Sequence, residues 1–222
     1  MSDLVPLIET TRGGTLECVH HGAVAVAGAG GRLLGSAGGP HWLGFTRSPH
    51  KAFPALPLLV LGGIRHFALA SRQLALLCAS HSGEPMHVEQ VEILLKKAGL
   101  SFKALQCGCH VPIFASMGLG PAPEPFDERH HNCSGKHAGF LAWCVQQGQP
   151  VASYLAPGHP LQQAVRRAVA RVAGLEPAQL RAGTDGCSAP NYAMPLSRLA
   201  RCYARLAQGA LGPGIGERFG TL

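Results

Sequence analysis

The chain has 222 residues, of which 46% are hydrophobic and 14% charged, which excludes a disordered chain and suits one sizeable α/β domain. Its net charge is +7, but the basic residues are scattered and form no dense block with interleaved aromatics, so we expect no nucleic-acid partner. No basic start followed by a long apolar core marks a secretion signal, and the most apolar run, 52–64, is too short for a membrane span. We expect a cytoplasmic protein with no membrane partner, in which most of the eight cysteines are buried thiols.

The first half of the chain predicts a hairpin and a helix. Val24 and Val26 alternate with small residues, and the glycine-rich stretch after them turns the chain back, which is typical of a β-hairpin. An apolar segment at 74–79 looks buried and runs into a polar turn. A helix is expected over 87–99, because apolar residues recur at helical spacing and a glycine follows two lysines at its end.

The second half predicts two more helices between loops. A strand followed by a turn is expected at 100–113, and the proline-rich segment 120–131 must be a loop. Helices are expected over 139–148 and 159–174, each ending at a glycine. The segment 183–209 predicts a turn-rich loop that leads into a helix.

Ser48 and Lys51 form an S-x-x-K pair in the sequence RSPHK. If a helix begins at Ser48, the three-residue separation places both side chains on one face. A hydroxyl becomes a useful nucleophile when a base removes its proton, and a lysine can act as that base when burial or a nearby cation lowers its pKa. The alternative is a helix-capping serine beside a solvated lysine, and the spacing alone favours this alternative.

A second polar turn, ASHSGE, holds Ser80, His81, Ser82 and Glu84 directly after the apolar segment. Turns at the ends of strands and helices are where α/β folds place reactive groups. The same residues also suit a serine-rich helix cap with Glu84 as its acidic partner. Both interpretations stay open.

The stretch HHNCSGKHAG, residues 130–139, combines a thiol, an amine and three imidazoles. A phosphate-binding loop is excluded, because that motif needs a glycine where His130 stands and a hydroxyl where His137 stands. A zinc finger is excluded as well, since the chain has no C-x-x-C pair.

A metal-chelating turn remains open for this stretch. Cys133 and Lys136 have the right spacing, and an amine binds a metal once it is deprotonated. Cys187, in the turn GTDGCSAP, could supply a third donor. The histidines of the same stretch are rival ligands, unless they are simply polar loop residues, and the pair Cys107 and Cys109 is a weaker metal or redox signal.

Four segments in this order resemble one family: TRSPHKAFPALPL, CASHSGEP, HHNCSGKHAGFLAW and GTDGCSAPNYAMPL. They are similar to the Rhizobium-type (asparaginase II, class 3) L-asparaginases, and the resemblance runs from about residue 17 to about residue 207. It implies an α/β (α+β) fold like that of glutaminases and serine β-lactamases, with an antiparallel sheet and packed helices. It also implies that a homodimer hydrolyses L-asparagine to aspartate and ammonia.

The resemblance gives the motifs roles. Ser48 and Lys51 match the first Ser-Lys pair of the family and Ser80 matches its second serine, so we expect either serine as the nucleophile and Lys51 as the base. Cys133, Lys136 and Cys187 match the family's zinc ligands. The positions expected to contact the substrate are Arg47, His81 and Asp185.

The same comparison predicts an incomplete asparaginase-like domain, 1–208, and an irregular tail, 209–222, because the chain stops before the segment that carries the family's second catalytic lysine. Ala52 and Pro54 also replace the proline and glutamine that usually follow the first motif. Two alternatives therefore stay open. One is a metal-independent S-x-x-K acylase or glutaminase, and the other is an inactive family member that survives as an oligomerising or zinc-binding module.

Overall fold

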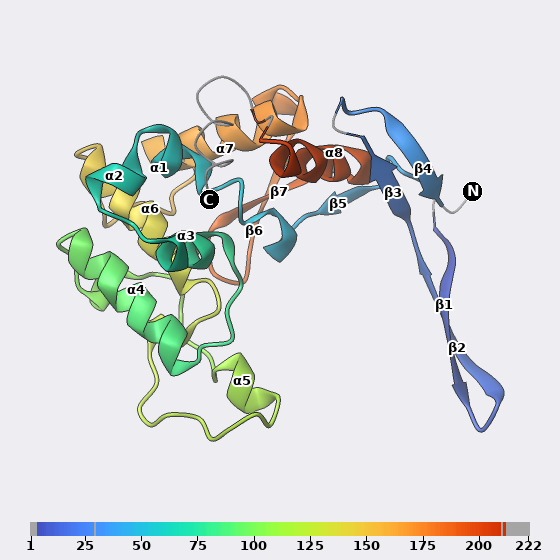
Figure 1. Cartoon of the computed structure of the whole chain (residues 1–222), viewed down its shortest axis with the longest axis horizontal. Coiled ribbons are helices and arrows are strands. Elements are labelled where there is room, and N and C mark those ends of the chain that lie inside the picture. Colours follow the sequence, from blue (N-terminus) through green and yellow to red (C-terminus); the bar gives the residue numbers. More distant parts are fainter. Residues whose placement is uncertain (1–3, 29, 210, 212–222) are drawn as a thin grey trace.

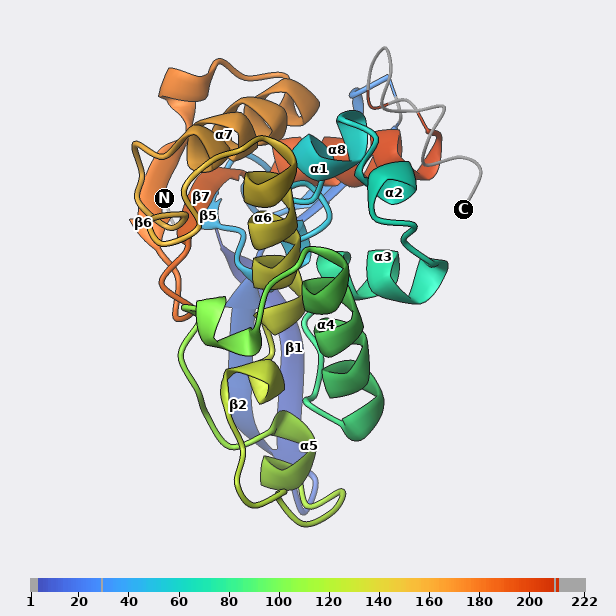
Figure 2. The same ribbon diagram turned by 90° about the vertical axis from the view of Figure 1, so that its left-hand side faces the viewer.

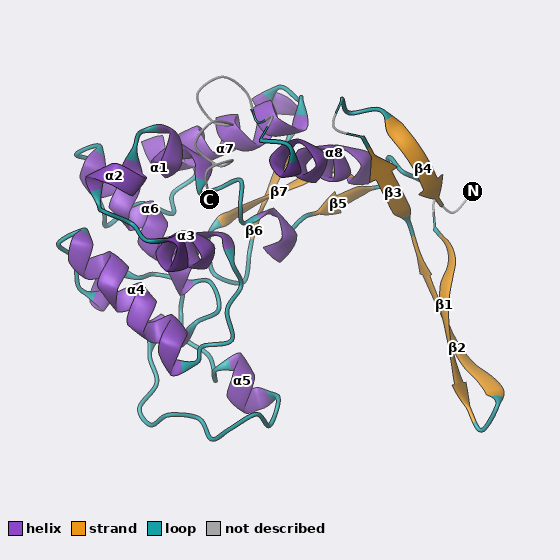
Figure 3. Cartoon of the chain, in the orientation of Figure 1, coloured by secondary structure: helices purple, strands orange, loops and turns teal. Residues whose placement is uncertain are grey.

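The computed structural model describes residues 4–28, 30–209 and 211, and it combines packed helices with short antiparallel sheets (Figures 1 and 3). The expected mixed fold of helices and antiparallel strands is therefore confirmed. Most of the tail predicted at 209–222 lies outside the described residues. Within the described part of the chain, no helix is long and apolar enough to cross a bilayer.

Two β-hairpins form the N-terminal part, and the first of them extends away from the helices as an arm (Figure 1). In this arm β1 (Val5–Arg12) pairs with β2 (Thr15–Gly22). The next hairpin, β3 (Val24–Ala27) with β4 (Leu33–Ala37), confirms the predicted one. The arm was not predicted, because almost every residue of β1 and β2 is exposed, so no buried face imposes an alternating pattern on the sequence.

A three-stranded antiparallel sheet joins a short early strand to two strands from late in the chain. Its order is β5 (Leu43–Phe45), β7 (Pro190–Pro195), β6 (Arg181–Thr184). The loop expected over the first part of 183–209 is therefore wrong, since β6 and β7 form a hairpin there. The central strand β7 is buried along its middle and has a proline at each end, where a missing amide hydrogen is tolerated.

The helices are α1 (Leu56–Val60), α2 (Gly63–His66), α3 (Ser71–Cys78), α4 (Pro85–Lys97), α5 (Ile113–Ser116), α6 (Ser134–Gln146), α7 (Pro160–Ala173) and α8 (Leu196–Ala207). The structure confirms four predicted helices, α4, α6, α7 and α8, although α6 begins at Ser134, five residues before the predicted start, and the other helices were not predicted. The apolar segment at 74–79 belongs to α3. The strand expected at 100–113 is wrong, because a 3-10 turn (Phe102–Ala104) capped by the side chain of Ser101 replaces it, and Cys107 and Cys109 lie outside any strand.

Helix α6 is the centre of the core, and α1, α3, α4 and α7 pack around it (Figure 2). Its residues 134–144 are all buried, as expected for a helix enclosed by others. A Cβ atom at Gly135 would lie 2.6 Å from the carbonyl oxygen of Leu76, so only glycine allows α3 to approach this closely. Because α6 is enclosed, its first turn carries the stretch HHNCSGKHAG into the interior instead of onto a solvated loop.

Candidate active site

Four segments that are distant in the sequence meet at the N-terminal end of α6. They are the 3-10 turn η1 (Ser48–His50), the loop after α3, the turn η3 (Glu128–His130) that leads into α6, and the turn between β6 and β7. The backbone amide of His81 donates to the carbonyl of Asn132 at 3.2 Å, which ties the loop after α3 to α6. Lys51, directly after η1, also contacts Asn132, and Cys187 of the β6–β7 turn contacts Lys136 of α6, so these motifs gather in one region.

Lys51 lies in the interior of this region, with 1% of its surface exposed, so the alternative of a solvated lysine is wrong. Its Nζ donates to the carbonyl of Asn132 at 3.3 Å. Burial lowers the pKa of Lys51, and the charge of Lys136 lowers it further, while hydrogen bonding to Cys133 acts in the opposite direction. A lysine whose ammonium form is disfavoured in this way can accept a proton from a neighbouring hydroxyl.

Cys133, Lys136 and Cys187, here called the thiol–amine cluster, come together from the start of α6 and the β6–β7 turn. Cys133 is the N-cap of α6 and Lys136 lies in its first turn. The Nζ of Lys136 is 3.3 Å from the Sγ of Cys187, and all three residues are buried. Hydrogen bonding between the two thiols lowers the pKa of Cys187 to about 2 and raises that of Cys133, so Cys187 is the thiolate and Cys133 keeps its proton.

His137 supports the charge of this thiolate from the next turn of α6. The hydroxyl of Tyr154 accepts a hydrogen bond from the amide of Gln106 at 2.9 Å and lies 2.6 Å from Nδ1 of His137. This contact fixes the orientation of the imidazole ring. Interaction with His137 contributes to the lowered pKa of Cys187.

The donors of the thiol–amine cluster suit a soft divalent cation, which prefers sulfur and nitrogen ligands. Among the described residues, no group of three or more His, Cys, Asp or Glu side chains could hold a metal ion. In two of the three histidines that are rival ligands, Nδ1 accepts a hydrogen bond from a backbone amide. His130 accepts from the amide of Asp127 at 3.1 Å, and His131 accepts from that of Cys133 at 3.0 Å.

The two candidate nucleophiles differ in their surroundings. Ser80 Oγ accepts a hydrogen bond from Asn132 Nδ2 at 2.8 Å, so Ser80 and Lys51 contact the same residue. Ser48 is exposed and opens η1, directly after Arg47, whose φ of 44° is in the left-handed region. Within the part of the chain that the structure describes, the hydroxyl of Ser48 has no hydrogen-bond partner. The backbone amide of Lys51 donates to the carbonyl of Ser48 at 3.2 Å.

The three positions expected to contact the substrate lie at the edge of this region. Arg47 Nε is 3.6 Å from Asp185 Oδ1, and the arginine side chain is 71% exposed while that of Asp185 is 11% exposed. His81 is buried, and both its ring nitrogens are engaged within the chain. Nδ1 accepts from the amide of Gly83 at 3.2 Å, and Nε2 is 2.8 Å from the hydroxyl of Ser134.

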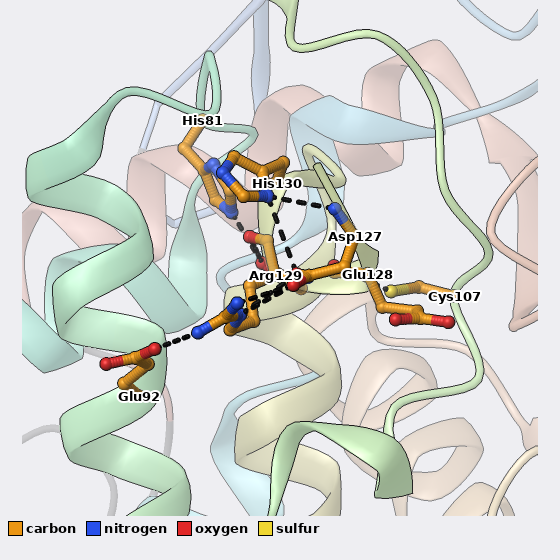
Figure 4. A network of polar contacts seen from close by, with 8 residues as sticks. His81, Glu92, Cys107, Asp127, Glu128, Arg129 and His130 are labelled. Atoms are coloured by element: carbon orange, nitrogen blue, oxygen red, sulfur yellow. Dashed lines mark hydrogen bonds and ion pairs between the residues drawn. The ribbon is translucent and has the colours of Figure 1, made fainter. Parts of the chain in front are cut away.

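A polar network fixes the turn that leads into α6 (Figure 4). The guanidinium of Arg129 pairs with Asp127, at 2.9 Å between Nε and Oδ1, and with Glu92 of α4. The hydrogen bond from Arg129 holds the pKa of the Asp127 carboxyl below its ordinary value. The hydroxyl of Ser134 donates to the carbonyl of Arg129 at 2.8 Å. Since the same hydroxyl contacts His81, the network connects α4 with the loop that carries Ser80.

Residues missed in the sequence complete the region. Asn132 contacts both Lys51 and Ser80, and Tyr154 holds the ring of His137. No motif or residue spacing identifies either residue in the sequence, because each acts through contacts between segments that are far apart along the chain. Asn132 could be suspected only because it lies inside the unusual stretch 130–139.

Comparison with known proteins adds one match. A family model described as L-asparaginase II matches residues 8–218, a range that contains every segment of the region described above. No curated protein matches the sequence.

Proposed function

Since the chain belongs to the L-asparaginase II family, as the match over residues 8–218 shows, we propose that it hydrolyses the side-chain amide of L-asparagine to L-aspartate and ammonia. Membership of this family places the chain among the amidohydrolases that act on a small molecule. The observation that carries the proposal is the burial of Lys51 in contact with Asn132, the residue that also bonds Ser80.

In the proposed mechanism, Ser48 or Ser80 is the nucleophile and Lys51 is the base. The neutral amine of Lys51 takes the hydroxyl proton while Oγ bonds to the amide carbon of the substrate. The carbon–nitrogen bond then breaks, and Lys51 returns the proton to the leaving ammonia. Water hydrolyses the resulting aspartyl ester, which releases aspartate and restores the serine.

Arg47 and Asp185 are proposed to hold the charged end of the substrate, with His81 nearby. Asparagine carries an α-carboxylate and an α-ammonium group, which match a guanidinium and a carboxylate. The two side chains are 3.6 Å apart and Arg47 is largely solvated, so a substrate can replace this weak pair at little cost. A cavity of about 600 Å³ beside Ser80 and His81 gives access from the solvent.

We also propose that the thiol–amine cluster holds a zinc ion. Cys133 and Cys187 would provide sulfur ligands and Lys136 a nitrogen ligand, and their burial and mutual contact support this role. When bound, the ion supplies positive charge close to Lys51, which favours the neutral form of that amine. Lys51 and the serines carry out the proton transfers and the attack themselves.

Two single substitutions distinguish the serines. Replacing the nucleophile, by Ser48→Ala or Ser80→Ala, is expected to lower ammonia release from asparagine by roughly 10³-fold or more with the fold intact, because no other hydroxyl replaces the attacking atom. Replacing the other serine is expected to have a smaller effect. Ammonia release from asparagine and from glutamine is measured for both variants, with circular dichroism as the test of folding.

Ser153→Ala is the control for these variants, since Ser153 is exposed and lies outside the region. The Ser-Lys assignment is wrong if both Ser48→Ala and Ser80→Ala keep the wild-type rate. Ammonia release from glutamine by metal-free protein would support the metal-independent glutaminase, and a folded wild type that releases none would support the inactive module.

We propose that the enzyme works as a homodimer in the cytoplasm. Large apolar side chains are exposed on the arm and the neighbouring strands, among them Ile8 at 61%, Val26 at 51% and Phe45 at 52%, and a second copy of the chain is a suitable cover for them. Light scattering during size-exclusion chromatography should give twice the chain mass. A single chain at micromolar concentration contradicts the dimer.

A further inference from the structure

One asparagine contacts most of the segments that meet at the site. The carbonyl of Asn132 accepts from the Nζ of Lys51 at 3.3 Å and from the amide of His81 at 3.2 Å. Its side-chain Nδ2 donates to Ser80 Oγ at 2.8 Å. On the other side, Nε2 of His110 lies 3.3 Å from its Oδ1 and 3.4 Å from its backbone nitrogen.

We propose that Asn132 positions and activates Ser80, and that His110 acts through Asn132 as a second positioning residue. This inference rests on the proposed function and deepens it, since it assigns a role to two residues that no motif identifies. A hydroxyl has one proton to donate and two lone pairs to accept with. Because Asn132 Nδ2 occupies a lone pair of Ser80 Oγ, the hydroxyl proton is directed elsewhere and can be removed by a base.

The same hydrogen bond becomes stronger as the reaction proceeds. When the proton leaves, negative charge develops on Ser80 Oγ, and a hydrogen bond to a charged acceptor is roughly twice as strong as one between neutral groups. A fixed donor that faces developing charge lowers the barrier without any reorganisation. Asn132 therefore acts on the attacking atom, whereas Lys51 is held by the carbonyl of the same residue.

The backbone next to Asn132 is held by hydrogen bonds, which fixes the place from which its Nδ2 donates to Ser80. The amide of Cys133 donates to Nδ1 of His131 at 3.0 Å, and the amide of Ser134 donates to the carbonyl of His131 at 2.9 Å. Asn132 thus sits between the end of η3 and the start of α6. Since Cys133 belongs to the thiol–amine cluster, Asn132 also fixes the distance between that cluster and Ser80.

His110 supports the backbone of Asn132 from outside. Its ring centroid is 4.4 Å from that of His131, and its Nδ1 is 2.7 Å from the carbonyl of Val111. Since a carbonyl can only accept, Nδ1 donates to it, and Nε2 accepts from the backbone amide of Asn132 at 3.4 Å. Among the described residues, no hydrogen bond joins His110 to Ser80 or Lys51, so the route from His110 to Ser80 runs through Asn132.

The test combines turnover with a readout that does not depend on asparagine. A fluorophosphonate reacts with activated serines, and peptide mass spectrometry locates the labelled residue. In Asn132→Ala, labelling of Ser80 and kcat for asparagine are both expected to fall about tenfold to a hundredfold, while KM changes by less than about threefold. Asn132→Asp keeps the size of the side chain but removes the donor, and should behave in the same way even if the alanine variant fails to fold.

A double-mutant cycle tests the role of His110. His110→Ala should slow the labelling of Ser80 about fivefold in the wild type but add nothing in the Asn132→Ala background, because coupled residues give non-additive effects. Gln147→Ala removes an exposed amide at the far end of α6 and should leave labelling unchanged.

The outcomes separate this inference from the proposed substrate. If Ser80 is labelled in an Asn132-dependent way but asparagine is not hydrolysed, the positioning role stands and the proposed substrate is wrong. If asparagine is hydrolysed while Asn132→Asp keeps wild-type labelling and kcat, the positioning role is wrong. Absence of labelling at Ser80 in the wild type, or labelling of Ser48 alone, also overturns it, as does an additive effect of His110→Ala.

Discussion

Lys51→Met is expected to lower kcat for asparagine hydrolysis by roughly 10³-fold, because a positioned base commonly contributes about 10²–10⁴-fold. Lys51 is buried and burial lowers its pKa, so in the native protein it can take a proton that methionine cannot. Methionine has a similar length and fills the same space. Since a buried ammonium is costly, the variant should be at least as stable as the wild type. Ammonia release and thermal unfolding measure the two effects.

Lys103→Met is the matched control, since Lys103 is exposed in the turn after α4. Its kcat should stay within about twofold of the wild type, as expected for a surface substitution. A Lys51→Met variant that keeps more than about a tenth of the wild-type rate would show that Lys51 is not the base.

Cys187→Ala is expected to remove both the metal and most of the activity. Cys187 is 1% exposed and is the thiolate of the thiol–amine cluster, so its loss leaves one thiol and one amine as protein donors. Zinc in the purified protein should fall from on the order of one ion per chain to close to none. The rate of ammonia release should fall by about tenfold or more, a loss typical of changes to the residues that hold a functional metal ion. Plasma mass spectrometry measures the zinc.

Cys202→Ala is the control for buried thiols. Cys202 lies in α8, is fully buried, and belongs to none of the segments that form the thiol–amine cluster. This variant should keep its zinc and its rate per folded molecule. Full zinc in Cys187→Ala, or none in the wild type, contradicts the proposed metal site.

The elements that the sequence predicts well are those with local signals. Helix α7 has Pro160 in its first turn and Gly174, at a φ of 67°, after its last, and both residues act within one turn of the backbone. The hairpin of β6 and β7 was missed, since β7 is central and buried, and its sequence does not alternate between apolar and polar residues. The arm of β1 and β2 was missed for the opposite reason, because nearly all its side chains are exposed.

The residues of the site also differ in whether a local sequence signal identifies them. Cys133 and Lys136 could be paired from the sequence because they lie within one turn of each other, and this turn proved to be the start of α6. The contact of Lys136 with Cys187 joins residues 51 positions apart. The sequence offered Cys187 as one possible third donor, and the family resemblance then assigned it with the other two. Asn132 could not be found, because its importance comes from side chains of several segments that meet only in the folded chain.

A crystal structure of the protein with aspartate, measured at the zinc absorption edge, would show the metal and the reacting groups together. We expect an anomalous peak in contact with the sulfurs of Cys133 and Cys187 and with the Nζ of Lys136. We also expect a product carboxylate at Ser80 or Ser48, within reach of Lys51. A missing or displaced peak, or aspartate bound away from both serines, would show that the proposed site is wrong.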